Sequence, residues 1–225
     1  MNLSIEDILR LTSFIPVLLY FGLRQEFTRA KQVLFWFFLF ITFHSLAYAS
    51  ISYFLTSIYS KAFNAIYIPV EFFIVSIFYY EANKGNLYRK FIKYVSTLFI
   101  LILSSRILID PTIDFDSMIN GVESVVIIFF SISYFYEQIK KPDTAFIDKD
   151  PFFWGISAFF LFFSVSFFVF LFRQYYWWLN DFYYQYVYIH ALSGIARNLI
   201  CSIAFLIKPY KEKPLEFSLK TNNEY

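Results

Sequence analysis

The chain has 225 residues, of which 59% are hydrophobic, 25% aromatic and 16% charged, with a formal net charge of +2. Soluble proteins carry about 25% charged residues, and a soluble domain of this length could not bury 33 Phe and 19 Tyr side chains. The single cysteine excludes a disulfide framework within the chain. The composition therefore indicates a membrane protein.

Seven apolar segments follow one another along the chain, each close to the ~20 residues that a helix needs to cross a ~30 Å hydrocarbon core. They are residues 5–23, 32–56, 63–82, 91–109, 117–136, 152–172 and 184–207. Backbone groups in lipid must be hydrogen-bonded internally, and these segments lack the alternation typical of barrel strands. We therefore expect α-helices.

The predicted fold is all-α: a polytopic membrane protein with a seven-transmembrane-helix, up-down bundle. The short connections predict that consecutive helices are antiparallel neighbours. We expect one domain, residues 1–207, followed by a short polar tail, residues 208–225.

Basic residues predict the orientation of this bundle, because cytoplasmic loops are rich in Lys and Arg. Fourteen of the nineteen lie after the first, third and fifth segments or in the tail: Arg24, Arg29, Lys31, Lys84, Arg89, Lys90, Lys93, Lys140, Lys141, Lys149, Lys208, Lys211, Lys213 and Lys220. The opposite connections hold only Lys61 and Arg173. We expect the N-terminus outside and the C-terminus in the cytoplasm.

A few polar residues lie inside the apolar segments, where an ionisable side chain costs about 2.5–3.5 kcal/mol to insert. In chain order they are His44, Glu71, Glu123, His190, Arg197 and Asn198. Arg197 lies too deep to reach water easily and needs a carboxylate or several carbonyls as partners. Its expected partner is Glu71, whose depth in the membrane is similar.

Two interpretations of this polar cluster stay open. Either the Glu71–Arg197 pair fixes the packing of two helices, or the whole cluster forms a chamber that meets a ligand or a proton. Two Glu and two His are also zinc ligands by type, although each lies on a different helix. The seven-helix hydrolases related to alkaline ceramidase, which the His pair resembles, carry a further His where this chain has Gly194. Whether a metal binds is therefore left open.

Several short motifs resemble uncharacterised seven-helix proteins of Bacteroidota. They are Val70-Glu71 in the third segment, Glu123 in the fifth, and Tyr188-Ile189-His190-Ala191-Leu192-Ser193 followed by Asn198-Leu199-Ile200 in the seventh. The resemblance implies a location in the bacterial inner membrane and no particular chemistry.

The sequence contains no P-loop, Gly-rich cradle or Ser/His/Asp set. We expect a non-enzymatic membrane module that senses a signal or binds a partner, with no cofactor. Its expected partners are the lipid bilayer and a cytoplasmic or membrane protein, and no nucleic acid. The alternatives are a small transporter whose polar site contains Glu71, Glu123, His190 and Arg197, and a metal-dependent intramembrane lipid hydrolase.

Overall fold

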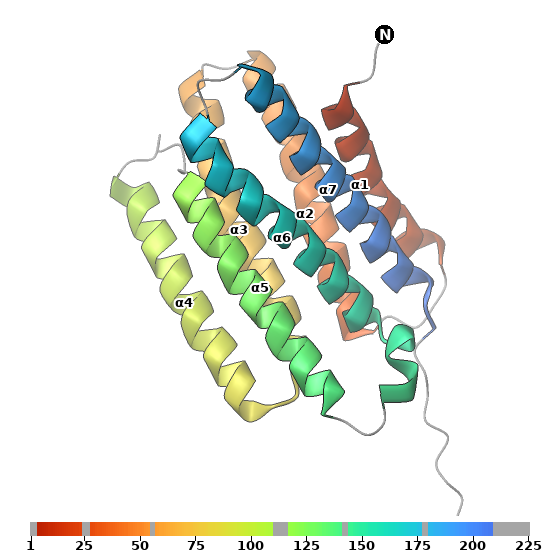
Figure 1. The fold of residues 1–225 in the computed structure, drawn as a ribbon. Helices are drawn as coiled ribbons and strands as arrows, with labels where there is room; N and C mark the ends of the chain where they lie inside the picture. The colour runs from red at the N-terminus through yellow and green to blue at the C-terminus, as the bar shows by residue number, and fades with distance from the viewer. Residues whose placement is uncertain are drawn as a thin grey trace, which may run out of the picture.

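The computed structural model describes residues 4–23, 28–54, 57–109, 117–140, 144–176 and 180–208. All regular structure in these ranges is helical (Figure 1). The elements are α1 (Ile5–Gly22), α2 (Arg29–Phe54), α3 (Ser57–Ala82), α4 (Asn86–Ile109), α5 (Ser117–Ile139), the short 3₁₀ helix η1 (Thr144–Lys149), α6 (Pro151–Tyr176) and α7 (Asn180–Leu206). Apart from Lys208, the predicted tail lies outside the described residues.

Within the described ranges, six of these helices are long and apolar enough to cross a membrane, so the chain is a multi-pass membrane protein. The six spans are Arg29–Ile51, Ala65–Ala82, Asn86–Ile109, Ile119–Ile139, Pro151–Phe172 and Gln185–Leu206. Helix α1 is not among them, because its 18 residues include Glu6, Asp7 and Arg10.

Several of the helices extend beyond the apolar segments that predicted them. Helix α3 begins at Ser57 and α7 at Asn180, several residues before the apolar segments that start at 63 and 184. Helix α1 begins at a capping box, in which the Asp7 backbone N–H donates to Ser4 Oγ at 3.2 Å and the Ser4 N–H donates to Asp7 Oδ2 at 3.1 Å. Apolar length therefore measures the part of a helix that lies in lipid, and polar residues continue the helix beyond it.

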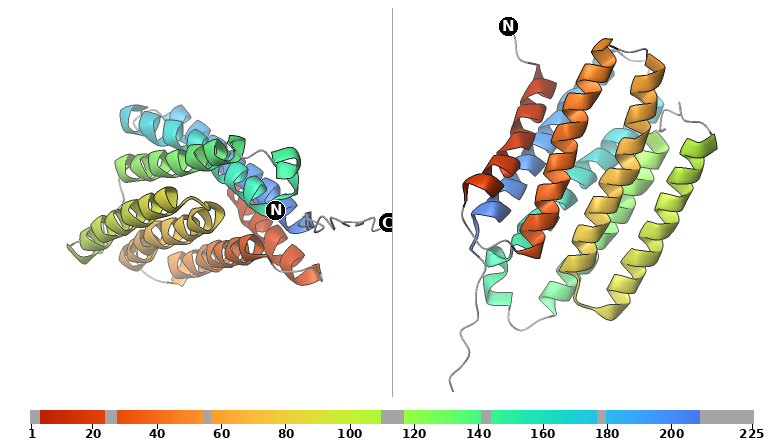
Figure 2. Two further views of the ribbon diagram at one scale, coloured as in Figure 1. Left: turned by 90° about the horizontal axis from the view of Figure 1, so that it is seen from below. Right: turned by 180° about the vertical axis from the view of Figure 1, so that it is seen from behind.

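Contacts join six of the helices into a closed ring. Seen from behind in Figure 2, α2, α3 and α4 lie in front of α5 and α6. Helix α1 packs between α2 and α7, α7 packs on α6, α6 on α5, and α5 reaches α3, which packs on α2. Helix α4 lies outside this ring against α3. Consecutive helices are therefore neighbours, as expected. Helices α4 and α5 meet through side chains, with the ring centroids of Phe91 and Phe129 5.3 Å apart, while α5 packs mainly on α6.

Aromatic side chains fill the centre of the ring. Phe159 of α6 is fully buried, with its ring centroid 4.9 Å from that of Phe37 on α2 and 5.7 Å from that of Phe78 on α3. Gly155, one turn before Phe159, lets α6 approach α3 closely, because a Cβ there would lie 2.5 Å from Phe78 Cζ.

Candidate functional site

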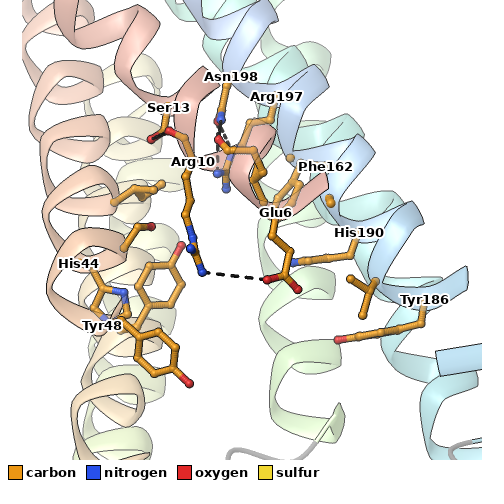
Figure 3. A pocket seen from close by; sticks show the side chains of 17 residues that line it. Glu6, Arg10, Ser13, His44, Tyr48, Phe162, Tyr186, His190, Arg197 and Asn198 are labelled. Atoms are coloured by element: carbon orange, nitrogen blue, oxygen red, sulfur yellow. Dashed lines mark hydrogen bonds and ion pairs between the residues drawn. The ribbon is translucent and has the colours of Figure 1, made fainter. Parts of the chain in front are cut away.

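A cavity of about 350 Å³ lies between α1, α2, α3, α6 and α7 (Figure 3). Small-molecule sites usually span about 300–1,000 Å³, so this volume suits a small metabolite. Its lining on α7 follows one face of the helix, with Tyr186, His190 and Arg197 at spacings of four and seven residues. Arg197 lies twelve residues after Gln185, where the span begins, or about 18 Å along the helix. The cavity therefore reaches from one end of the bundle to the middle of the membrane.

Arg197 forms the deep end of the cavity and is only 4% exposed. Its Nη1 lies 3.3 Å from Glu71 Oε1, which confirms the predicted ion pair between α7 and α3. Its Nε and Nη2 both donate to Asn198 Oδ1 at 3.3 Å, and the guanidinium lies 4.3 Å from the centroid of the Phe162 ring. These contacts hold the guanidinium in one position and, among the described residues, do not use all five of its N–H groups.

Asn198 joins this cluster to the first helix. Its Nδ2 donates to Thr12 Oγ1 at 3.1 Å and to the Leu9 carbonyl at 3.4 Å. The Asn198 side chain accepts hydrogen bonds from Arg197 and donates hydrogen bonds to α1. A substitution of Asn198 would therefore remove both sets of hydrogen bonds. Asn198 therefore belongs to the cluster that the sequence predicted, and it also fixes one wall of the cavity.

The two glutamates lie behind the cavity wall and do not line it. Glu71 accepts hydrogen bonds from Arg197 and from the hydroxyl of Tyr67, which does line the cavity. Glu123 on α5 is 4% exposed, interacts electrostatically with Glu71, and has no hydrogen-bond partner for Oε1 among the described residues. Of these two neighbouring buried carboxyl groups, Glu71 alone is paired with the guanidinium of Arg197 among the described residues.

The two histidines lie on opposite walls of the cavity (Figure 3). On α2, the His44 ring stacks on Phe63 with centroids 4.7 Å apart and hydrogen-bonds the Phe63 backbone, while its Nε2 has no hydrogen-bond partner in the described ranges. On α7, His190 Nδ1 lies 3.4 Å from Ser166 Oγ, and its ring is parallel to that of Tyr186.

The two Glu and two His of the predicted cluster are residue types that can bind a metal ion. Among the described residues, however, no three side chains of His, Cys, Asp or Glu gather in a way that could hold one. The zinc-hydrolase alternative therefore has no structural observation in its favour.

The mouth of the cavity is formed by residues that the sequence did not single out. Arg10 Nη1 lies 3.6 Å from Asp7 Oδ1, and Arg10 Nη2 lies 4.0 Å from Glu6 Oε2 (Figure 3). Glu6, Arg10 and Ser13 lie at spacings of four and three, so they share one helix face that points to the cavity. This spacing is the sequence signal that would have identified them.

No known protein family, curated protein or solved structure matches this chain. Its function must therefore be argued from the cavity and its lining.

Proposed function

We propose that this chain is a seven-span module of the bacterial inner membrane that binds a small polar ligand in the cavity and senses it without catalysis. One observation carries the proposal: a ligand-sized cavity reaches the membrane interior and ends at a buried, pre-positioned guanidinium. A buried charge is expensive in a membrane and is usually functional. A packing ion pair alone would need no cavity beside it.

In this proposal α1 is the seventh span and the cavity opens on the outer face. Helix α1 packs along α7 and α2 within the bundle, and Asn198 bonds to it. Its charged residues, Glu6 and Arg10, are at the end where Tyr186 of α7 also lines the mouth, and there they can reach water. The excess of Lys and Arg in the connections at the other end supports a cytoplasmic position for that end.

The lining suggests the chemistry of the ligand. Arg197 is balanced by Glu71, and Arg10 lies beside Glu6 and Asp7, so no strong net charge faces the cavity. Free N–H groups of Arg197 suit a carboxylate or carbonyl, and the rings of Phe162, Tyr48 and Tyr186 suit a flat or cationic part. We infer a zwitterionic or neutral polar molecule of metabolite size.

Signal transfer in this proposal uses the ring of helices. A ligand in the cavity contacts α1 and α2 on one side and α6 and α7 on the other. Its binding therefore favours one position of the α1–α2 pair relative to the α6–α7 pair. The partner docks at the opposite end, where Lys140 and Lys149 flank the connection between α5 and α6. Lys141, the third basic residue of this predicted docking site, lies outside the described residues.

A matched pair of substitutions tests ligand binding. Ser45 lines the cavity on α2, whereas Ser50 on the same helix is exposed. A library of amino acids, betaines and nucleobases would be screened by thermal shift on the purified protein. We expect a hit that raises the Tm of the wild type and of S50F but leaves S45F unchanged. Stabilisation that persists in S45F, or a library without hits for the wild type, would argue against the site.

Glu123 favours one second candidate, a proton-coupled transporter. Glu123 is buried beside a second carboxyl group, and its Oε1 has no hydrogen-bond partner among the described residues, so it is suited to carry a transported proton. In vesicles loaded with a pH dye, the transporter predicts substrate-dependent proton uptake that E123Q abolishes. Ligand binding without any flux in the wild type would instead support the sensing function.

A further inference from the structure

A second hollow lies on the outside of the ring, between α3 and α4, and has a volume of about 280 Å³. Phe73, Ser76, Ile77 and Tyr80 line it from α3, and Ile92, Lys93, Ser96, Thr97 and Ile100 from α4. Both helices are among the six that can cross a membrane, so this groove faces lipid. It shares no lining residue with the cavity described above.

Two hydroxyl groups in the groove lack partners. Ser76 is 5% exposed and Ser96 is 7% exposed, and neither Oγ has a hydrogen-bond partner among the described residues. Serines in helices usually bond the carbonyl four residues earlier, as Ser131 bonds Ile127 at 2.9 Å and Ser133 bonds Phe129 at 2.8 Å. A buried polar group without a partner is costly, so two of them in one groove indicate a ligand that supplies the missing bonds.

Cationic groups lie at the end of the groove nearest the connection between α3 and α4. Lys93 is exposed and lines the groove. Arg89, one turn earlier on the same face, lies 4.2 Å from the centroid of the Tyr80 ring, and its buried Nε has no hydrogen-bond partner in the described part of the chain. Lys93 is seven residues from the start of α4, or about 10 Å, which is the depth at which a lysine can extend to the lipid headgroups.

We propose that the groove between α3 and α4 binds one anionic phospholipid from the surrounding bilayer. The phosphate pairs with Lys93 and Arg89, and the hydroxyl groups of Ser76 and Ser96 donate to the ester carbonyls below it. The acyl chain then follows the apolar part of the groove toward Phe73 and Ile100. Basic pockets between transmembrane helices recognise anionic headgroups in this way.

The test compares phosphatidylglycerol with phosphatidylcholine of the same acyl chains, bound to the full-length protein and counted by native mass spectrometry. We expect one retained phosphatidylglycerol and an affinity about fivefold lower in K93Q. K90Q is the matched control, since it removes the same charge from an exposed residue that does not line the groove. Equal retention of both lipids, or equal losses in K93Q and K90Q, would overturn the proposal.

A second variant separates lipid binding from folding. S76A/S96A loses no hydrogen bond to any residue that the structure describes, so its Tm in lipid-free detergent should equal or exceed that of the wild type. Its retention of phosphatidylglycerol should fall. Unchanged retention, or a second copy of the chain cross-linked to wild-type α4 in place of lipid, would refute the assignment. These outcomes do not depend on any ligand in the cavity.

Discussion

Substituting the two members of the Arg197–Glu71 ion pair tests whether the pair serves only to pack α7 against α3 or also to bind a ligand. The two charged atoms are 3.3 Å apart and both side chains are buried. Coulomb's law with an effective dielectric constant of about 20 gives an attraction on the order of 5 kcal/mol. Removing one partner of such a pair costs about 3–5 kcal/mol, while replacing both with apolar groups of similar volume is often close to neutral.

We therefore expect R197M to lower the free energy of unfolding by about 3–5 kcal/mol, because it leaves Glu71 buried without its cation. R197M/E71L should recover most of that loss, and yet neither variant should bind the ligand. The assays are reversible unfolding in mixed micelles and ligand-induced thermal shift. R10M is the control for stability. The ion pairs of Arg10 are exposed, so this variant should lose less than about 1 kcal/mol of unfolding free energy. A double variant as unstable as R197M, or one that still binds ligand, would refute this reasoning.

Two further predictions concern the packing of the bundle. G155A should lower the free energy of unfolding by about 1–3 kcal/mol, because its Cβ would collide with Phe78; G121A, which meets nothing within 4 Å, should be neutral or stabilising. K31M should cost about 1–2 kcal/mol, because Lys31 Nζ donates to the carbonyls of Phe205 at 3.1 Å and Ile207 at 2.7 Å, at the C-terminal end of α7. The exposed K90M is its control in the same unfolding assay, and equal losses in the two Lys variants would contradict the capping role.

Hydropathy alone predicts the six long spans, because lipid imposes a length and a composition on any helix that crosses it. The first segment is predicted less well: Glu6, Asp7 and Arg10 occupy its first turns, so the same measure excludes α1 although it packs on α7 and α2. Depth along a helix also predicted the pairing of Arg197 with Glu71.

The cavity itself could not be predicted from the sequence. It depends on α1 packing against α7, a contact between the two ends of the chain that no local pattern specifies. The rotation of each helix about its axis is also set by packing. That rotation is why Tyr67 lines the cavity while Glu71, one turn later, lies behind it, and why Glu123 faces Glu71 and not the ligand space.

Chemical labelling from one side of the membrane tests the central claim that the cavity opens to the outside. The only cysteine, Cys201, is fully buried and gives a silent background. In spheroplasts, S45C should react with a membrane-impermeant thiol reagent, because residue 45 lines the cavity. The wild type should not react, because its cysteine is buried. Labelling of S45C only in inverted vesicles, or on neither side, would contradict an outward-facing cavity.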